Sequence, residues 1–352
     1  MTKHVRVAIA AVPVLLAAGA AVLPLPAAVI EEKYSMQLYP GLQNILTRIT
    51  NLVPIALLDL AIVVLLVVIV GWLVAQTRRL GFLPAVRRGI WPAFLLVVDI
   101  YLVFLVFWGL NYRRLPLEQK IEFDATRVTA DTMQTLGTTA ARMLNAGYAA
   151  AHATEQTGPS LEEAFVSAQR TLGSEWLATP GVLKRSLLQL YFRQAAIDGM
   201  TDPWFLEVIV NPDTLPFERP FVILHEWGHL AGYAHEAEAN FLAWIACLHG
   251  NPLAQYSGWL AIYEHVLAAL PQGQRKALLA QLEPGPRQDL NASAARYARS
   301  SPVVRTAARD VYDSYLRANR VEEGIASYTG VVRLILGAGV EDGGTPRLRP
   351  RQ

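Results

Sequence analysis

Long runs of hydrophobic residues are concentrated in the first third of the chain. Three of them, Val5–Ile30, Leu52–Gln76 and Trp91–Tyr112, are long and apolar enough to cross a bilayer, which takes about 20 residues. The first also has the basic start and small residues of a cleaved signal peptide, but its apolar run is longer than such a peptide needs. We therefore predict a membrane region over residues 1–112 with three transmembrane helices, the first of them retained.

Charged residues within and beside these runs add two expectations. Basic residues are more frequent on the cytoplasmic side of a membrane protein. With three spans, the side of the membrane that holds the N-terminus has six basic residues: Lys3, Arg6, Arg78, Arg79, Arg87 and Arg88. The opposite side has four: Lys33, Arg48, Arg113 and Arg114. Everything after Tyr112 is then expected outside the cytoplasm. Asp59 and Asp99 lie inside the second and third runs, where a carboxylate either serves a function or is neutralised or hydrogen-bonded between packed helices.

From residue 113 to residue 340 the pattern becomes that of a folded, mainly helical domain. Amphipathic segments with helical periodicity recur, and Ser160 with Glu163 has the spacing of a helix capping box. The exception is Pro203–Pro220, where the β-branched run EVIVN, residues 207–211, predicts a strand followed by a turn. The expected fold is a helical α+β domain with a small sheet, followed by a disordered tail over residues 341–352.

Composition narrows the functions that the chain can have. Its 352 residues include 31 Lys and Arg against 29 Asp and Glu, a formal net charge of +2, so a nucleic-acid partner is not expected. The only cysteine is Cys247, which excludes an internal disulfide and a cysteine-based zinc cluster.

The segment HEWGH, residues 225–229, fits the pattern H-E-x-x-H. Residues four apart lie on one face of a helix, so His225 and His229 would present two imidazoles to one zinc ion, with Glu226 beside it as general base. The apolar residues before the pattern support a helix with one buried side. The alternative reading is a pair of surface histidines.

Three residues that follow this pattern compete to be the third ligand. His235 completes the longer pattern of the metzincins, but none of the five methionines follows it to form the Met-turn that those enzymes need. Glu236 and Asn240 fit E-x-x-A-N, which resembles the gluzincin arrangement of a zinc-binding glutamate and an outer residue that hydrogen-bonds a ligand histidine. Glu238 is the remaining alternative.

Geometry sets a condition for the carboxylate. In a continuous helix with a rise of about 1.5 Å per residue, Glu236 would lie roughly 10 Å along the axis from His229, whereas zinc–ligand bonds are about 2 Å long. The chain must therefore turn back between them, and Gly232 is the residue suited to end a helix in the left-handed conformation. We rank Glu236 before Glu238 and His235.

Four segments carry a resemblance to a known family. They are FWGLNYRRLPL at residues 107–117, the approach segment 198–220, HEWGHLAGYAHEAEANFLAW at 225–244, and VYDSYLRANRVEEGIASYTGVVRLIL at 311–336. In these the chain resembles the bacterial membrane-anchored, zincin-like family known as domain of unknown function thirty-eight-ten. His235 departs from the basic residue expected at that position. The resemblance implies a metallopeptidase-like domain and supplies no substrate.

Together these features predict a membrane-anchored zinc metallopeptidase that hydrolyses peptide bonds. It is expected to cross the bacterial inner membrane several times, with the catalytic domain outside the cytoplasm. His225, His229 and Glu236 would hold Zn²⁺ and keep a fourth position for water, whose proton Glu226 would accept. The expected partners are a peptide or protein substrate and the lipid bilayer.

Two further roles and one alternative function complete the prediction. Tyr328, in a family-like element, is predicted to stabilise the negative charge that develops on the carbonyl oxygen. The strand EVIVN is a candidate for edge-on pairing with an extended substrate, or is an ordinary edge strand. The alternative function is a non-catalytic, zinc-containing membrane receptor or assembly factor.

Overall fold

The computed structural model describes residues 3–23, 25–319, 321 and 330–350. The chain is mainly helical, with 70% helix and 4% strand, which confirms the predicted class. The helices before residue 130 are α1 (Lys3–Val22), α2 (Ala27–Val29), the π-helical η1 (Ile30–Leu38), α3 (Tyr39–Thr50), α4 (Leu57–Leu80), α5 (Phe82–Phe107), the short 3-10 turns η2 (Gly109–Arg113) and η3 (Ala125–Arg127), and α6 (Leu117–Lys120).

The remaining elements form the globular part. Its helices are α7 (Ala130–Ala151), α8 (Leu161–Thr171), α9 (Gln189–Ala195), α10 (Arg219–Leu230), α11 (Glu236–His249), α12 (Pro252–Ala269), α13 (Gln272–Leu279), α14 (Pro284–Ala298), α15 (Pro302–Ala318) and α16 (Gly330–Ala338). Its strands are β1 (Leu183–Lys184), β2 (Gly199–Asp202) and β3 (Glu207–Val210).

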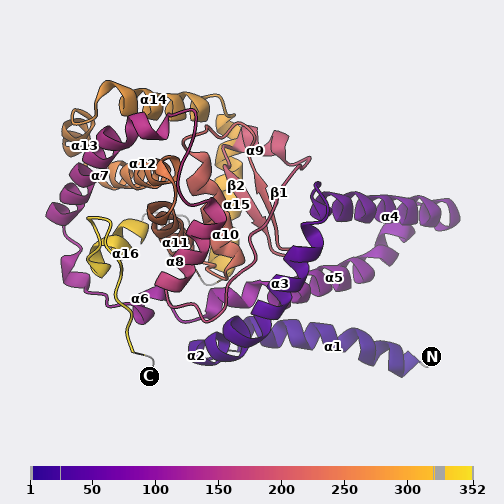
Figure 1. Cartoon of the computed structure of the whole chain (residues 1–352). Helices are drawn as coiled ribbons and strands as arrows, with labels where there is room; N and C mark the ends of the chain where they lie inside the picture. The colour runs from indigo at the N-terminus through magenta and orange to yellow at the C-terminus, as the bar shows by residue number, and fades with distance from the viewer. Residues whose placement is uncertain (1–2, 24, 320, 322–329, 351–352) are drawn as a thin grey trace.

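Two helices, α4 and α5, are long and apolar enough to cross a membrane. They project side by side from the globular part, with α1 next to them (Figure 1). The first predicted span corresponds to α1, where the described side chains form a shorter apolar stretch, Ala11–Ala20. The structure thus supports two of the three predicted spans, and the first stays a prediction.

Hydrogen bonds fix the start of α4 to the globular part. Glu207 of β3 accepts from the backbone N–H of Leu57 at 2.8 Å. Asp59 accepts from the hydroxyl of Ser186 and from the backbone N–H of Leu187. The Asp59 carboxylate therefore lies in the first turn of its helix, where the helix dipole favours negative charge, and bonds to a loop of the globular part. Asp99 of α5 is exposed.

The core of the globular part is built around α11. Its residues Phe241, Leu242 and Trp244 are fully buried, and it packs against α8, α10, α12 and α16. The rings of Trp244 and Trp259 meet edge to face with centroids 5.6 Å apart, a favourable arrangement for aromatic pairs. Such a helix, apolar on nearly every side, must be enclosed by others.

Local sequence signals account for several helix starts. Ser160 and Glu163 bond to each other's backbone N–H groups at the start of α8, so the predicted capping box is confirmed. Thr129 and Thr132 do the same at the start of α7. These bonds satisfy backbone donors that have no partner within the first helical turn.

The three strands form one small sheet in the order β1-β3-β2. β1 runs parallel to β3, with Leu183 opposite Val208, and β2 runs antiparallel to it, with Thr201 opposite Val208. The predicted strand EVIVN is confirmed as β3, but it is the central strand. Since both of its edges are paired, it offers no free edge to a substrate, and that part of the prediction is wrong.

The segment predicted as a disordered tail makes a few contacts in its described part, residues 341–350. Leu348 pairs with Ile121 in an isolated antiparallel bridge, and Arg349 donates its backbone N–H to Lys120. The Leu348 side chain also lies against Gly173, where a Cβ would come within 2.8 Å of it. The disorder of this tail stays a prediction.

Candidate metal centre

A tight turn brings the two halves of the predicted site together. Gly232 has a φ of +81°, and it ends α10 with two backbone bonds, from its own N–H to His229 and from Tyr233 N–H to Gly228. This is the Schellman arrangement of a left-handed helix end. The chain then reverses into α11, whose first residue is Glu236, so the predicted break at Gly232 is confirmed.

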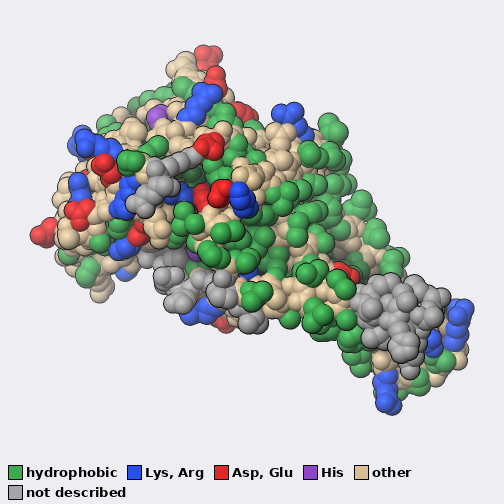
Figure 2. All heavy atoms as spheres, turned by 90° about the horizontal axis from the view of Figure 1, so that it is seen from below, with side chains coloured by type: hydrophobic (Ala, Val, Ile, Leu, Met, Phe, Trp, Pro, Cys, Tyr) green, Lys and Arg blue, Asp and Glu red, His purple; other side chains and the backbone are tan. Residues whose placement is uncertain are grey.

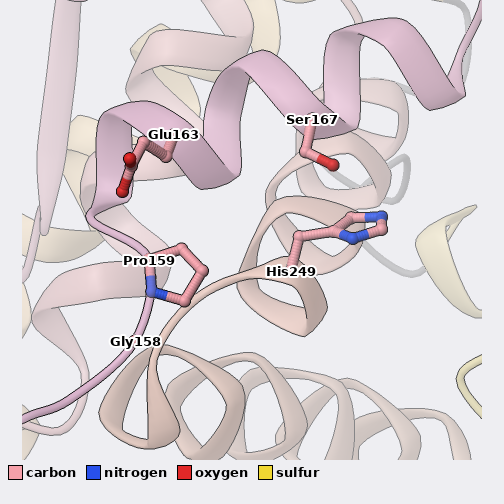
Figure 3. A pocket seen from close by; sticks show the side chains of 5 residues that line it. All are labelled: Gly158, Pro159, Glu163, Ser167 and His249. Carbon is pink, nitrogen blue, oxygen red and sulfur yellow. The ribbon is translucent and has the colours of Figure 1, made fainter.

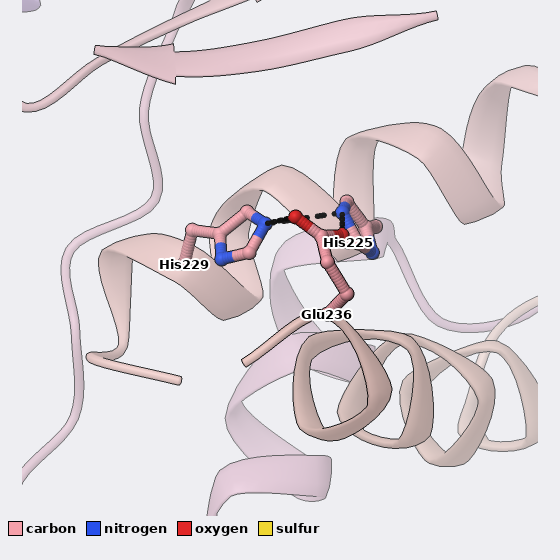
Figure 4. A group of neighbouring side chains, drawn as sticks. All are labelled: His225, His229 and Glu236. Atoms are coloured by element: carbon pink, nitrogen blue, oxygen red, sulfur yellow. Dashed lines mark hydrogen bonds and ion pairs between the residues drawn. The ribbon is translucent and has the colours of Figure 1, made fainter. Parts of the chain in front are cut away.

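The structure brings His225, His229 and Glu236 together. Their candidate ligand atoms all lie within 4.8 Å of one another (Figure 4). The Nε2 atoms of His225 and His229 are 3.1 Å apart. Glu236 Oε2 lies 3.3 Å from Nε2 of His225, and Glu236 Oε1 lies 3.6 Å from Nε2 of His229. Two ligands of a tetrahedral zinc ion with bonds of about 2 Å are separated by about 3.3 Å, so the spacing fits three such ligands.

The hydrogen bond made by His229 determines which nitrogen faces Glu236. Its Nδ1 lies 2.8 Å from the carbonyl oxygen of Tyr233. A carbonyl can only accept, so Nδ1 carries the proton and Nε2 has a free lone pair. Burial lowers the pKa of His229 to about 4 despite the nearby Glu236. This imidazole is therefore neutral at pH 7, as a metal ligand must be.

The other two members of the cluster carry opposite charges in the absence of an ion. Burial would lower the pKa of His225, but Glu236, Glu226 and Asn240 raise it to about 9. Burial would raise the pKa of Glu236, but the two histidines and Tyr312 lower it to about 2. The cluster is thus an ionised carboxylate enclosed by nitrogen groups, and Glu236 Oε2 and His225 Nδ1 are buried without a hydrogen-bond partner.

Asn240, one helical turn after Glu236 in α11, lies near His225. It is buried and helps to raise the pKa of His225, although neither its Nδ2 nor Nδ1 of His225 reaches hydrogen-bond geometry. Exchanging the amide oxygen and nitrogen by rotating the side chain would let the oxygen accept from Nδ1–H. That is the role predicted for Asn240 beside a ligand histidine.

Glu226 lies beside His225 and contacts strand β2 of the sheet. The hydroxyl of Thr201 in β2 donates to its carboxylate at 2.8 Å and also bonds to its backbone oxygen. A Cβ on Gly199 would come within 2.5 Å of the same carboxylate, so only glycine leaves room for it there. Burial raises the pKa of Glu226 to about 7, within the range where a general base works best.

The two alternative ligands bond elsewhere. Glu238 accepts from the backbone N–H of Leu117 at 2.6 Å, and His235 Nε2 lies 3.3 Å from the backbone oxygen of Tyr112. Glu238 lies on another face of α11 from Glu236, and His235 lies before the helix begins. Of the three candidates, the structure places Glu236 beside the two histidines.

A tyrosine that sequence reasoning missed reaches the cluster. The hydroxyl of Tyr312 in α15 donates to Glu236 Oε1. The predicted Tyr328 lies outside the described residues. Tyr312 belongs to the family-like segment VYDSYL, which was the available signal, but the spacing from Glu236 along the sequence gives no hint of contact.

Further charged groups line the side of the centre formed by α12 and α14. Arg296 pairs with Asp198 at 2.7 Å, next to Gly199 in the sequence. Burial lowers the pKa of His265 to about 4, and the charge of His225 contributes. This imidazole is therefore neutral at pH 7.

Residues from the N-terminal third support the metal-centre helix from outside. Trp108 Nε1 donates to the backbone oxygen of His229 at 3.0 Å, and the hydroxyl of Tyr39 donates to the backbone oxygen of Leu230 at 2.9 Å. The guanidinium of Arg114 donates to the backbone oxygen of Gly232. These bonds satisfy carbonyls that α10 leaves free at its end. Helix α3 and η2 are therefore part of the structure that positions the site.

A surface hollow of about 450 Å³ lies away from the metal centre (Figure 3). Gly158, Pro159, Glu163, Ser167 and His249 line it. His249 ends α11, which places the hollow about 20 Å along that helix from Glu236. Glu163 is already engaged in the capping box, so the hollow lacks the convergent polar groups of a binding site.

Comparison with known proteins gives one match. The family model described as a protein of unknown function (DUF3810) matches residues 34–336, which include the metal centre, β2 and α15. No curated protein and no solved structure matches the chain.

Proposed function

The chain belongs to the DUF3810 family of proteins of unknown function, and we propose that it is a membrane-anchored zinc metallopeptidase. The observation that carries the proposal is the position of Glu226. Glu226 lies next to the three candidate ligands but is not one of them. Its carboxylate accepts a hydrogen bond from Thr201 and occupies space that a side chain at position 199 would fill. A metal site that served structure alone would need no buried carboxylate beside it.

The donor set supports zinc as the metal. His225, His229 and Glu236 provide two nitrogens and one oxygen at spacings that suit tetrahedral coordination. Glu236 Oε2, a candidate ligand atom, is buried without a hydrogen-bond partner. When bound there, zinc would supply a Lewis acid and lower the pKa of a water molecule in its open position.

The residues of the chain would then perform the proton transfers. Glu226 would accept the proton of the attacking water and pass it to the leaving amine. Its raised pKa suits both steps, because it can hold and release a proton near neutral pH. Thr201 would keep the carboxylate oriented through its hydroxyl.

Strand β2, in place of EVIVN, is suited to orient a peptide substrate. It pairs with β3 along one edge, and no other strand among the described residues pairs with its second edge. Gly199 and Thr201 of the same strand contact Glu226. An extended peptide that adds to the free edge would therefore lie along the catalytic carboxylate.

Tyr312 is the residue best placed to stabilise the transition state. Its hydroxyl reaches Glu236 in the absence of an ion, and this carboxylate would turn toward a metal. The hydroxyl could then donate to the carbonyl oxygen on which negative charge develops. Tyr312 is thus a second candidate for the role predicted for Tyr328, which lies outside the described residues.

The experiment that tests the proposal is a search for cleavage products. The full chain in detergent, loaded with zinc, is incubated with a peptide library, and new termini are identified by mass spectrometry. Wild type is expected to cut at defined positions, and Glu226→Gln at equal zinc content is expected to cut slower by on the order of 100-fold or more. Equal cleavage by the two, or none by either, would favour the zinc-containing receptor or assembly factor.

A further inference from the structure

Helix α3 has its polar and apolar sides reversed relative to a helix on a protein surface in water. Its side chains that face the globular part are Gln43, Thr47 and Thr50, exposed by 0%, 0% and 2%. The side that faces away carries Ile45 and Ile49, exposed by 60% and 55%. A helix between a protein core and water shows the opposite distribution.

Hydrogen bonds satisfy every one of the buried polar side chains. Gln43 donates to the backbone oxygen of Thr179 and accepts from its N–H. Thr47 donates to the backbone oxygen of Leu206, and Thr50 to that of Thr47. The reversal is thus a stable arrangement, because buried polar groups cost little once they are bonded. It leaves the apolar side of α3 without a partner among the described residues.

The exposed apolar side continues beyond α3. Leu38 and Leu52 extend the helical stripe at the two ends of α3, exposed by 51% and 82%. Leu187 and Leu190, exposed by 75% and 67%, lie at the start of α9. We name these six residues the α3 face: Leu38, Ile45, Ile49, Leu52, Leu187 and Leu190. Contiguous apolar surface of this kind marks an interaction site.

Backbone pairing joins the two parts of the α3 face beside the start of α4. Ile55 forms a bridge with Arg185, Asn51 bonds to Pro180 and Val182, and Asp59 holds Ser186 and Leu187. Hydrophobic side chains cover the projecting helices and continue onto the adjoining part of the molecule (Figure 2). The α3 face is therefore continuous with the apolar surface of α4.

The globular part also reaches over the last turns of α5. Trp204 Nε1 donates to the backbone oxygen of Ile100, and its ring lies 6.1 Å from that of Phe104. Arg48 is exposed beside the apolar stripe of α3. A basic residue on the flank of an apolar helix face is typical of helices that lie in a membrane surface, where its charge reaches the headgroups.

We propose that the α3 face lies in the headgroup and outer acyl layer of the bilayer that α4 and α5 cross, so that the globular part is partly immersed in lipid. This inference rests on the membrane anchoring of the proposed function and is independent of hydrolysis. The bilayer is favoured over a protein partner because the α3 face is continuous with α4, which would be surrounded by lipid. Tyr39 of the same helix bonds to α10, so one helix would separate the metal-centre helix from the membrane.

Site-specific fluorescence tests the immersion in the full chain. Single cysteines replace Ile45, Leu187, Val67 of α4 and Val303 of α15 in a Cys247→Ala background, and each is labelled with a small environment-sensitive dye in lipid vesicles. Val67 and Val303 are both exposed, by 67% and 79%, and serve as the lipid and water references. Quenching is measured with doxyl lipids and with aqueous iodide.

We expect Ile45 and Leu187 to be quenched by shallow doxyl lipids and to be about fivefold less accessible to iodide than Val303, since an apolar face lies below the headgroups. If doxyl lipids quench the dye at Val67 while iodide quenches the dyes at Ile45 and Leu187, the immersion of the α3 face is wrong and the membrane anchoring by α4 is retained. If neither quencher reaches Ile45 and Leu187, a second copy or another protein covers the α3 face, which also overturns it. If Val67 itself reports water, the membrane anchor of the proposed function fails.

Discussion

At the scale of single residues, the position of Glu226 depends on the absence of a side chain at Gly199. Gly199 has no side chain, and the nearest carboxylate oxygen of Glu226 would lie only 2.5 Å from a Cβ built there. Thr201, two residues along the strand, supplies the one hydroxyl that holds the carboxylate. The catalytic role that we propose for Glu226 therefore depends on strand β2 as much as on its own helix.

Gly199→Ala is expected to reduce peptide cleavage while leaving zinc content unchanged. The added methyl group must push the Glu226 carboxylate aside, and a displacement of about 1 Å can cost on the order of 100-fold in rate. Zinc content and cleavage are measured on the same preparation. The matched control is Gly273→Ala, where nothing lies within 4 Å of the added atom. Unchanged cleavage by Gly199→Ala would contradict the proposed position of the base.

The sequence predicted the members of the candidate site better than the residues around it. The proximity of His225 and His229 follows from helical spacing alone, since residues four apart share one face. Tyr312 lies 76 positions from Glu236 and is brought to it by tertiary packing, so spacing carries no information on this contact. Thr201 and Gly199 depend on which edge of the sheet faces α10, and the sequence does not encode that pairing locally.

At the scale of elements, the end of α10 is held by residues from the first 114 positions of the chain. Tyr39, Trp108 and Arg114 bond to its last carbonyls and to the turn at Gly232, and Glu31 pairs with Arg114 through two hydrogen bonds of 2.8 Å. The predicted membrane region, residues 1–112, and the predicted domain that follows it thus share one structural support.

A chain that begins at residue 113 is therefore expected to bind less zinc than the full chain. It loses Tyr39, Trp108 and Glu31, each lost hydrogen bond costs about 1 kcal/mol, and Arg114 would be left buried without its carboxylate. Zinc content and thermal unfolding of both proteins are compared in detergent. A chain that begins at residue 26 keeps Glu31, Tyr39 and Trp108 and is the control. Equal zinc and equal stability in the shortest chain would refute the shared support.

The pair of Glu31 and Arg114 is expected to make stability depend on pH. Burial opposes ionisation of Glu31, but Arg114 and Lys120 lower its pKa from 4.5 to about 2. A lowered pKa adds stability above the unfolded value, and this stability is lost as the pH falls from 4.5 toward 2. Arg114 is the main partner, because its hydrogen bonds and charge lower the pKa of Glu31 more than those of Lys120 do.

Glu31→Gln should accordingly reduce the free energy of unfolding by about 3 kcal/mol at pH 7. The difference from wild type should shrink through the same acidic window, as measured by chemical unfolding in detergent at several pH values. Glu32→Gln is the neighbouring control, since Glu32 and its partner Lys33 are 64% and 62% exposed and such pairs add little. A difference that does not change with pH would count against the ion pair.

Elements were predictable where the signal is local. The capping box at Ser160, the turn at Gly232 and the strand at 207–210 were all expected and are present. One expectation failed because it depends on distant partners. The strand is central, and not at an edge, because β1 and β2 both pair with it.

At the scale of the whole molecule, the hydrophobic runs predicted the projecting helices, but the position of residues 30–50 did not follow from the sequence. These residues lie between two predicted spans and were assigned to the membrane region. In the structure, η1 and α3 pack against the globular part with polar side chains inward. Periodicity identifies an amphipathic helix but does not say which side faces protein and which faces lipid.

The family match extends from residue 34 to residue 336, so it covers α3, α4 and α5 together with the metal centre. This range agrees with a single functional unit in which the projecting helices and the globular part belong together. The full chain, in detergent or in vesicles, is the appropriate material for every test of the proposed activity.

Zinc content of the full chain tests the central claim most directly. Wild type is compared with His225→Ala, Glu226→Gln, Glu236→Ala, Glu238→Gln and His235→Ala by elemental mass spectrometry. We predict about one zinc per chain in wild type, retained when Glu226, Glu238 or His235 is replaced and lost when His225 or Glu236 is replaced. A well-folded wild type without metal, or a Glu236→Ala variant that keeps its zinc, would contradict the account.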